Sequence, residues 1–108
     1  METIKFDDWK KLDIRVGEIR KVEKHPNADK LYLLKVDVGD EEKQIVTGLR
    51  DYYELDELKG KKVVLFCNLE PVDLRGEKSE GMVLAACNDK EVILLAPESD
   101  INVGAKIE

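Results

Sequence analysis

A polar segment between two apolar runs carries most of the side chains in this chain that could bind a ligand. The runs, Val63 to Phe66 and Met82 to Ala86, have the length and composition of strands that are buried on both faces. Between them, Pro71, Gly76 and Gly81 predict irregular backbone. The same region holds side chains that donate hydrogen bonds or carry positive charge, namely Asn68, Arg75, Lys78 and Ser79. A loop that presents such groups between two rigid elements is typical of a binding site.

Catalytic chemistry has little support in the sequence. The chain has no Walker loop, no Gly-x-Gly-x-x-Gly motif and no nucleophile block beside its single histidine. That residue, His25, precedes a proline in a predicted turn, which it shapes or caps. Cys67 and Cys87 form no Cys-x-x-Cys pair and lack a histidine at ligand spacing, so we interpret them as buried or half-buried thiols. We expect a binding module with no metal and no cofactor, rather than an enzyme.

Length and charge narrow the class of protein further. With 108 residues the chain is expected to form one domain. It has no apolar run near the ~20 residues that a membrane-spanning helix needs, and its start is too polar for a secretory signal, which favours a cytoplasmic protein without membrane contact. The net charge of −6 by itself argues against nucleic-acid binding. However, residues 1–35 hold nine basic and seven acidic side chains, so we expect a locally basic face.

The elements that must position these groups follow from the apolar pattern. A short helix is predicted within Ile4 to Leu12, and a helix or helical turn at Arg50 to Leu58. Strands are predicted from Asp13 to Val22 with a bend at Gly17, and at Leu31 to Val38, Lys43 to Thr47, Val63 to Asn68, Met82 to Asn88 and Glu91 to Ala96. This order suits an oligonucleotide-binding (OB) barrel, although the strand count also suits an SH3-like barrel or a small β-sandwich.

Four blocks of sequence, in order along the chain, resemble one known family. They are Asp13-Ile-Arg-Val-Gly, His25-Pro-Asn-Ala-Asp-Lys-Leu-Tyr, Ile45-Val-Thr-Gly-Leu, and a pattern that begins at Asn68, Asn-Leu-x-Pro-x-x-x-Arg-Gly-x-x-Ser-x-Gly-Met-x-Leu-Ala-Ala. They resemble the tRNA-binding domain that is attached to methionyl-tRNA synthetases or occurs as a separate chain. Related copies occur in free-standing tRNA-binding proteins and in small secretion-chaperone proteins. The blocks cover roughly Phe6 to Ile107.

The resemblance implies an all-β OB fold, which is a five-stranded Greek-key barrel. The barrel is expected at residues 13–88, with the N-terminal helix at residues 1–12, a helix between the third and fourth strands, and additional C-terminal strand structure within residues 89–108. It also implies a non-catalytic function. In the family this domain binds the outer corner of the L-shaped tRNA without reading the anticodon, and assists the catalytic chain of methionyl-tRNA synthetase.

Carried over residue by residue, the resemblance predicts an RNA-binding site formed by Lys30, Asn68, Arg75, Lys78, Ser79, Gly81 and Met82. Arg75 suits bidentate contact with phosphate oxygens, while Lys30 and Lys78 suit contact as point charges. The glycine lets the backbone approach RNA closely, and Met82 offers an adaptable apolar surface to a ribose or a base. Glu70 departs from the family, which often has lysine there, and its charge would repel phosphate.

The resemblance further implies a homodimer formed through the N-terminal segment and the C-terminal strands. The expected interface residues are Phe6, Trp9, Leu12, Val92, Leu94 and Ile107. Two other functions remain open. The chain could form a chaperone-like dimer that binds extended peptides in the apolar parts of the same binding site, or it could be a docking module within a synthetase complex.

Overall fold

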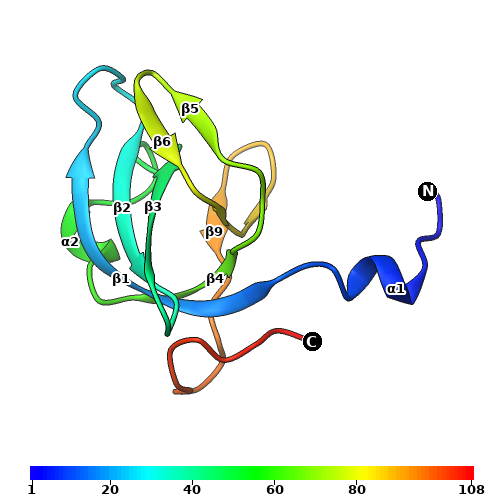
Figure 1. Cartoon of the computed structure of the whole chain (residues 1–108). Coiled ribbons are helices and arrows are strands. Elements are labelled where there is room, and N and C mark those ends of the chain that lie inside the picture. Colours follow the sequence, from blue (N-terminus) through cyan, green and yellow to red (C-terminus); the bar gives the residue numbers. More distant parts are fainter.

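A strongly curved antiparallel sheet forms the body of the molecule (Figure 1). The computed structural model describes residues 1–108. Its elements, in chain order, are α1 (Phe6–Trp9), β1 (Ile14–Lys24), β2 (Tyr32–Asp37), β3 (Glu42–Thr47), α2 (Leu55–Leu58), β4 (Lys62–Phe66), β5 (Val72–Leu74), β6 (Glu77–Ser79), β7 (Met82–Val83), β8 (Ala85–Cys87) and β9 (Val92–Leu94).

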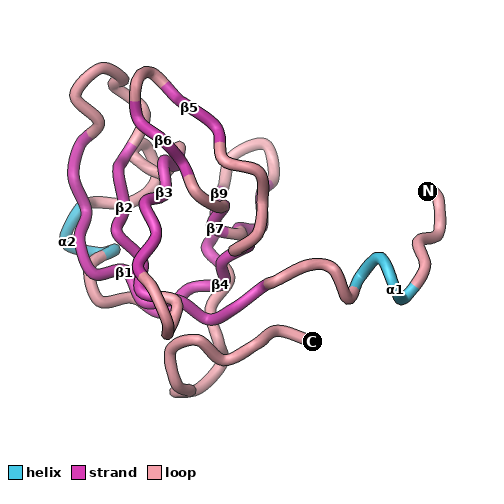
Figure 2. Tube along the Cα trace, viewed as in Figure 1, coloured by secondary structure: helices cyan, strands magenta, loops and turns pink.

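The main sheet has the order β3-β2-β1-β4-β7, and all neighbouring strands in it are antiparallel. The open edge at β3 is covered by the chain around β6, because the Glu80 N–H donates to the Gln44 carbonyl at 2.8 Å. The Ser79 hydroxyl also accepts the Val46 N–H at 3.0 Å. Figure 2 shows the strands arranged around the resulting interior. The fold is therefore a nearly closed OB-type barrel, as the sequence predicts.

Alternation along β2 fills the barrel interior. Tyr32, Leu34 and Val36 point inward and are buried, whereas the residues between them are partly exposed. Ile19 from β1 and Leu65 from β4 complete the centre of the same core. A strand pattern of period two therefore places the core correctly, since one face of each strand lies against the others.

The predicted bend in the first strand and the predicted lengths of the helices need correction. The irregularity in β1 lies between Ile19 and Lys21, not at Gly17. Gly17 is required for a different reason: a Cβ at this position would lie 2.6 Å from Cγ1 of Val36 on the neighbouring strand. The helices are also shorter than predicted, since α1 and α2 have four residues each.

The largest difference concerns the segment between β4 and β7. The sequence predicts an irregular loop there, but the structure has a two-stranded hairpin, in which β5 pairs with β6 (Figure 1). The predicted continuous strand from Met82 to Asn88 is divided into β7 and β8, and it is not buried on both faces, because Met82 and Ala86 are exposed.

The C-terminal segment packs beside β1. Residues 95–108 run past the barrel as extended loop, and the Ile107 N–H donates to the Ile14 carbonyl at 2.8 Å. The segment that carries α1 extends away from the barrel (Figure 1). The C-terminal extension therefore packs partly on its own barrel, through β9 and through these contacts with β1.

Candidate nucleic-acid interface

The β5–β6 hairpin presents Arg75 at its tip. Arg75 and Gly76 form the two-residue turn, with φ angles of 57° and 90°. Two successive positive φ angles are typical of a type I′ turn, whose twist matches that of the flanking strands. The Gly76 N–H donates to Oδ1 of Asp73 at 2.9 Å, which closes the turn. The Arg75 side chain is exposed.

The β1–β2 loop lies against this hairpin. His25, in that loop, contacts the Leu74 carbonyl through Nε2 at 2.9 Å, and the Asn27 side chain donates to the Arg75 carbonyl at 3.3 Å. Residues of the loop and Arg75 line a shared surface hollow of about 350 Å³, which also contains Lys30. Two cationic residues that are far apart in sequence are therefore brought to one place.

A second part of the surface is organised by Gln44 on β3. Its amide donates to the Lys78 carbonyl at 2.9 Å and to the Glu77 carboxylate at 3.3 Å, so it fixes β6 against β3. Its oxygen accepts a hydrogen bond from Lys35 at 2.9 Å. Lys78, on the hairpin, remains exposed. Sequence analysis missed Lys35 and Gln44, whose outward position on the paired strands could have been read from the alternation of β2 and β3.

The cations at this surface belong to the larger group of basic residues that form no ion pair. Six basic residues are paired with carboxylates on the surface: Lys11, Arg15, Arg20, Lys21, Lys43 and Lys62. Lys30, Arg75 and Lys78 take part in none of these pairs, and neither does Glu70. Unpaired cations are free to contact phosphate without first breaking an ion pair.

Ser79 does not belong to the exposed surface. Its side chain is 3% exposed, and its hydroxyl accepts the Val46 N–H and donates to the Gly81 carbonyl at 3.1 Å. Gly81 is buried too, since a Cβ there would lie 2.6 Å from the Phe66 carbonyl oxygen. Both residues shape the approach of β6 and β7 to the barrel, and neither is exposed for direct contact with RNA.

Asn68 and Met82 occupy different surroundings. The Asn68 amide accepts the Asp13 N–H at 2.8 Å and donates to the Lys11 carbonyl at 2.7 Å, so it ties the N-terminal segment to the end of β4. Met82 is 45% exposed and borders an apolar hollow of about 320 Å³ at the end of β3. We interpret Asn68 as a structural link and retain Met82 as an apolar surface residue.

The Asp13-Ile-Arg-Val-Gly block has a structural role as well. Arg15 donates to both oxygens of Asp13 at 2.9 Å, to Asp40 at 2.8 Å and to the Val38 carbonyl at 3.2 Å. The hydrogen bonds from Arg15 lower the pKa of the Asp13 carboxyl group, although burial opposes the shift. They also raise the pKa of Arg15. This motif therefore joins the N-terminal segment, β1 and the β2–β3 turn.

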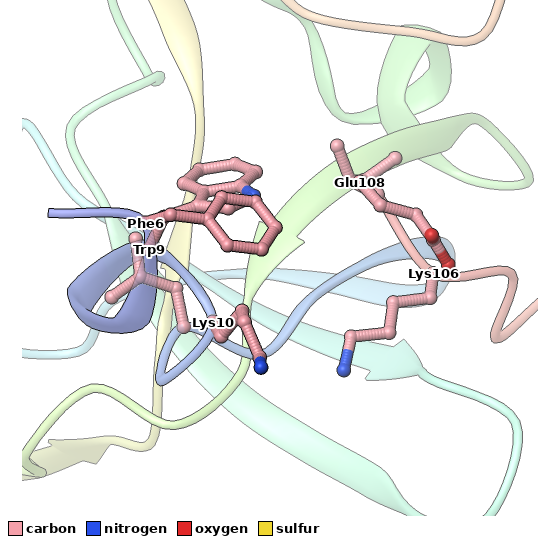
Figure 3. Close-up of a pocket in the computed structure, with 7 residues that line it drawn as sticks. Phe6, Trp9, Lys10, Lys106 and Glu108 are labelled. Carbon is pink, nitrogen blue, oxygen red and sulfur yellow. The ribbon is translucent and has the colours of Figure 1, made fainter.

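The predicted dimer residues divide into two groups. Phe6, Trp9, Leu12 and Ile107 line a hollow of about 310 Å³ between α1 and the C-terminal segment (Figure 3). Lys10, Lys106 and Glu108 lie at the same hollow, and Phe6 is 70% exposed. Leu94, in contrast, is buried in the barrel core, and Val92 packs against that core. The outward-facing residue of β9 is Ile93, which sequence analysis missed.

Other kinds of site have no support in the structure. No group of three or more histidine, cysteine, aspartate or glutamate side chains is placed to hold a metal ion. Both cysteines are free thiols, Cys67 buried and Cys87 exposed. None of the helices has the length and apolar character required to cross a bilayer.

Comparison with known proteins shows which family the chain belongs to. Residues 14–106 match the family model described as "Putative tRNA binding domain". The chain belongs to this tRNA-binding domain family. It is 52% identical over 107 residues to the methionine–tRNA ligase of Thermococcus kodakarensis, a match that spans 99% of this chain and 14% of the ligase. The chain thus corresponds to about one seventh of the length of that relative.

Two solved structures extend the comparison. A MetRS related protein from Pyrococcus horikoshii superposes with a TM-score of 0.92 and 37% identity, with all of both chains covered. The CsaA chaperone protein from Picrophilus torridus superposes with a TM-score of 0.89 and 35% identity, over 98% of this chain and all of CsaA. Structures similar to this chain therefore include one described as synthetase-related and one described as a chaperone.

Proposed function

We propose that this chain is a non-catalytic, structure-specific tRNA-binding module that assists a methionyl-tRNA synthetase in the cytoplasm by capturing tRNA. The observation that carries the proposal is the group of three unpaired cations, Lys30, Arg75 and Lys78, on the β1–β2 loop and the adjoining hairpin. Membership of the tRNA-binding family and the likeness to methionine–tRNA ligases support it.

The proposed contact follows from the chemistry of folded RNA. A-form RNA presents phosphates and 2′-hydroxyls along a wide, shallow minor groove, so shape recognition requires spaced cations more than base readers. Arg75 would bridge phosphate oxygens, while Lys30 and Lys78 would contact neighbouring phosphates. The net charge of −6, together with Asp29 in the same hollow as Lys30 and Arg75, opposes phosphate binding, so binding depends on these few cations. We therefore expect modest affinity that falls steeply as the salt concentration rises.

Filter binding with a purified tRNA tests the site. Replacement of Lys30, Arg75 or Lys78 by alanine should each weaken binding about ten- to 150-fold, the effect expected for loss of a charge-assisted hydrogen bond. Each substitution should also reduce the slope of log affinity against log salt by about 1. Lys59 provides a matched control, because it is exposed, has no ion pair and lies at the end of α2. Wild-type affinity in all three variants would refute the site.

A second function has specific support. The hollow beside Met82 has seven apolar residues among its nine, and CsaA, a structural neighbour, is described as a chaperone. A peptide-binding function would place an extended apolar segment in this hollow. Binding of such a peptide should vary little with salt, whereas tRNA binding should weaken, so a titration of each ligand at two salt concentrations separates the two functions.

We also propose a homodimer. The exposed Phe6 and the hollow around Trp9 support it, since exposed apolar patches mark interaction surfaces, and Ile93 is a further exposed apolar residue on β9. A dimer would present two copies of the cationic surface to one tRNA or to two.

A further inference from the structure

His25 connects the two segments that carry the proposed cations. The residue is only 4% exposed, and it stands at the start of the β1–β2 loop. Its backbone N–H donates to the Leu31 carbonyl at 3.1 Å, which closes the loop that contains Lys30. Its ring contacts the hairpin that carries Arg75. One buried side chain thus bridges both parts of the surface.

We propose that His25 is a positioning residue for RNA binding, which locks the β1–β2 loop onto the β5–β6 hairpin so that Lys30 and Arg75 act together on one stretch of phosphate backbone. This inference rests on the proposed function, because it assigns a role to a residue that does not itself touch RNA.

The hydrogen bonds of the ring define its protonation and its orientation. Nδ1 lies 2.9 Å from the backbone N–H of Asn27, so Nδ1 accepts. Nε2 lies 2.9 Å from the Leu74 carbonyl oxygen, so Nε2 carries the proton and donates. The neutral ring with hydrogen on Nε2 satisfies both contacts at once. One nitrogen holds the ring within its own loop, and the other reaches across to the hairpin.

The hairpin needs such support at its tip. β5 and β6 have three residues each and pair with one another in a separate two-stranded sheet. Arg75 is the only non-glycine residue with a positive φ, a conformation that costs a side-chain-bearing residue about 1–2 kcal/mol. His25 contacts the Leu74 carbonyl, and Asn27 donates to the Arg75 carbonyl. These two carbonyls lie on either side of the Arg75 backbone, whose φ angle is strained. Without them, the tip is free to relax and to move Arg75 away from Lys30.

Two substitutions of His25 separate the roles of its two nitrogens. Asparagine keeps a short acceptor for the Asn27 N–H but is too short to reach the Leu74 carbonyl. Glutamine places an amide donor near the position of Nε2 and restores the contact with the hairpin. His25→Asn should weaken tRNA binding about tenfold, and His25→Gln should recover most of that loss, to within about threefold of wild type.

A double-mutant cycle with Arg75→Ala shows whether His25 acts through the arginine. If it does, His25→Asn should change affinity less than about twofold once Arg75 is replaced by alanine, since coupled residues are non-additive.

Asn27→Ala is a milder probe, because Asn27 is exposed and its loss leaves only an exposed carbonyl without a partner. It should weaken binding about threefold, again only when Arg75 is present. Thermal unfolding of every variant checks that the barrel is folded.

The outcomes distinguish this inference from the proposed function. If Arg75→Ala and Lys30→Ala bind tRNA like wild type, the proposed function fails and the positioning role fails with it. If Arg75→Ala weakens binding while folded His25→Asn and Asn27→Ala bind normally, only the positioning role is overturned. Full additivity of His25→Asn with Arg75→Ala overturns it too. Should His25→Asn not fold, the Asn27 cycle decides alone.

Discussion

At the scale of single residues, Arg75 combines an unfavourable backbone conformation with an exposed charge. Its φ of 57° lies in the left-handed region, where asparagine and glycine are at ease and arginine is not. Strain of this kind is often retained at binding sites. Arg75→Asn should therefore raise the free energy of unfolding by about 1 kcal/mol while it weakens tRNA binding about tenfold. Urea denaturation and filter binding measure the two effects.

Lys78→Asn is the matched control for these effects on stability and tRNA binding. It removes the same charge from the same hairpin, but Lys78 lies in β6 and has no positive φ. This variant should lose affinity without any gain in stability, because asparagine is a poor strand residue. An Arg75→Asn protein that is no more stable than wild type would show that the turn is not strained.

Ser79 is the site residue whose predicted role changes most. Serine in a polar segment indicates a surface contact, but the strand alternation of β6 turns this hydroxyl into the barrel. Ser79→Ala should lower the free energy of unfolding by about 1–3 kcal/mol, because the Val46 N–H and the Gly81 carbonyl lose a buried partner. The tRNA affinity of the folded protein should stay unchanged. Ser99→Ala, at an exposed serine without a side-chain hydrogen bond, should leave both quantities unchanged.

At the scale of elements, the sequence predicts the long strands and misses the short hairpin of β5 and β6. β2 and β4 show clear alternation or a sustained apolar run, and the structure confirms both. The β5–β6 hairpin has strands of three residues, too short for a periodic pattern, and its turn contains Arg75 where such turns usually have asparagine, aspartate or glycine. Local sequence therefore indicates a loop, whereas contacts from β3 and the β1–β2 loop stabilise the hairpin.

The hydrogen bonds from Arg15 to Asp13, Asp40 and the Val38 carbonyl hold several elements together. The ion pair of Arg15 with Asp13 should make stability depend on pH. Because the pKa of Asp13 is lowered in the folded protein, its contribution is present above the unfolded value of about 3.9 and is lost as the pH falls through the folded pKa. Asp13→Asn should lower the free energy of unfolding at pH 7 by about 1 kcal/mol. The difference from wild type should shrink near pH 3, as urea denaturation at both pH values would show.

Asp51→Asn serves as the control for this pH series. Asp51 is exposed and takes part in no ion pair, so its replacement should change stability little at either pH. A difference between wild type and Asp13→Asn that stays constant from pH 7 to pH 3 would mean that the carboxylate charge does not contribute.

At the scale of the whole molecule, the sequence predicts which charged side chains are exposed better than it predicts the contacts of small polar residues. The cationic residues Lys30, Arg75 and Lys78 are all exposed, as expected for groups with costly desolvation. Small polar residues are harder to assign, because Asn68 and Ser79 satisfy backbone groups as readily as they contact a ligand. His25 is buried between the β1–β2 loop and the hairpin, and the sequence could not place it, since its partner across the surface, the Leu74 carbonyl, is 49 residues away.

The arrangement of α1 bears most directly on oligomeric state. A four-residue helix without a buried residue has little reason to be stable by itself, yet it carries Phe6 and Trp9 beside an open apolar hollow. A second copy of the chain would cover these groups.

We expect light scattering to give twice the mass of one chain, and Phe6→Ala combined with Trp9→Ala to give a monomer. Because two linked sites bind a multivalent ligand more tightly than one, the monomer should also lose tRNA affinity, by about tenfold or more. Tyr52→Ala, at an exposed aromatic residue after β3, should leave the mass and the affinity unchanged. A monomeric wild-type protein at micromolar concentration would contradict the dimer.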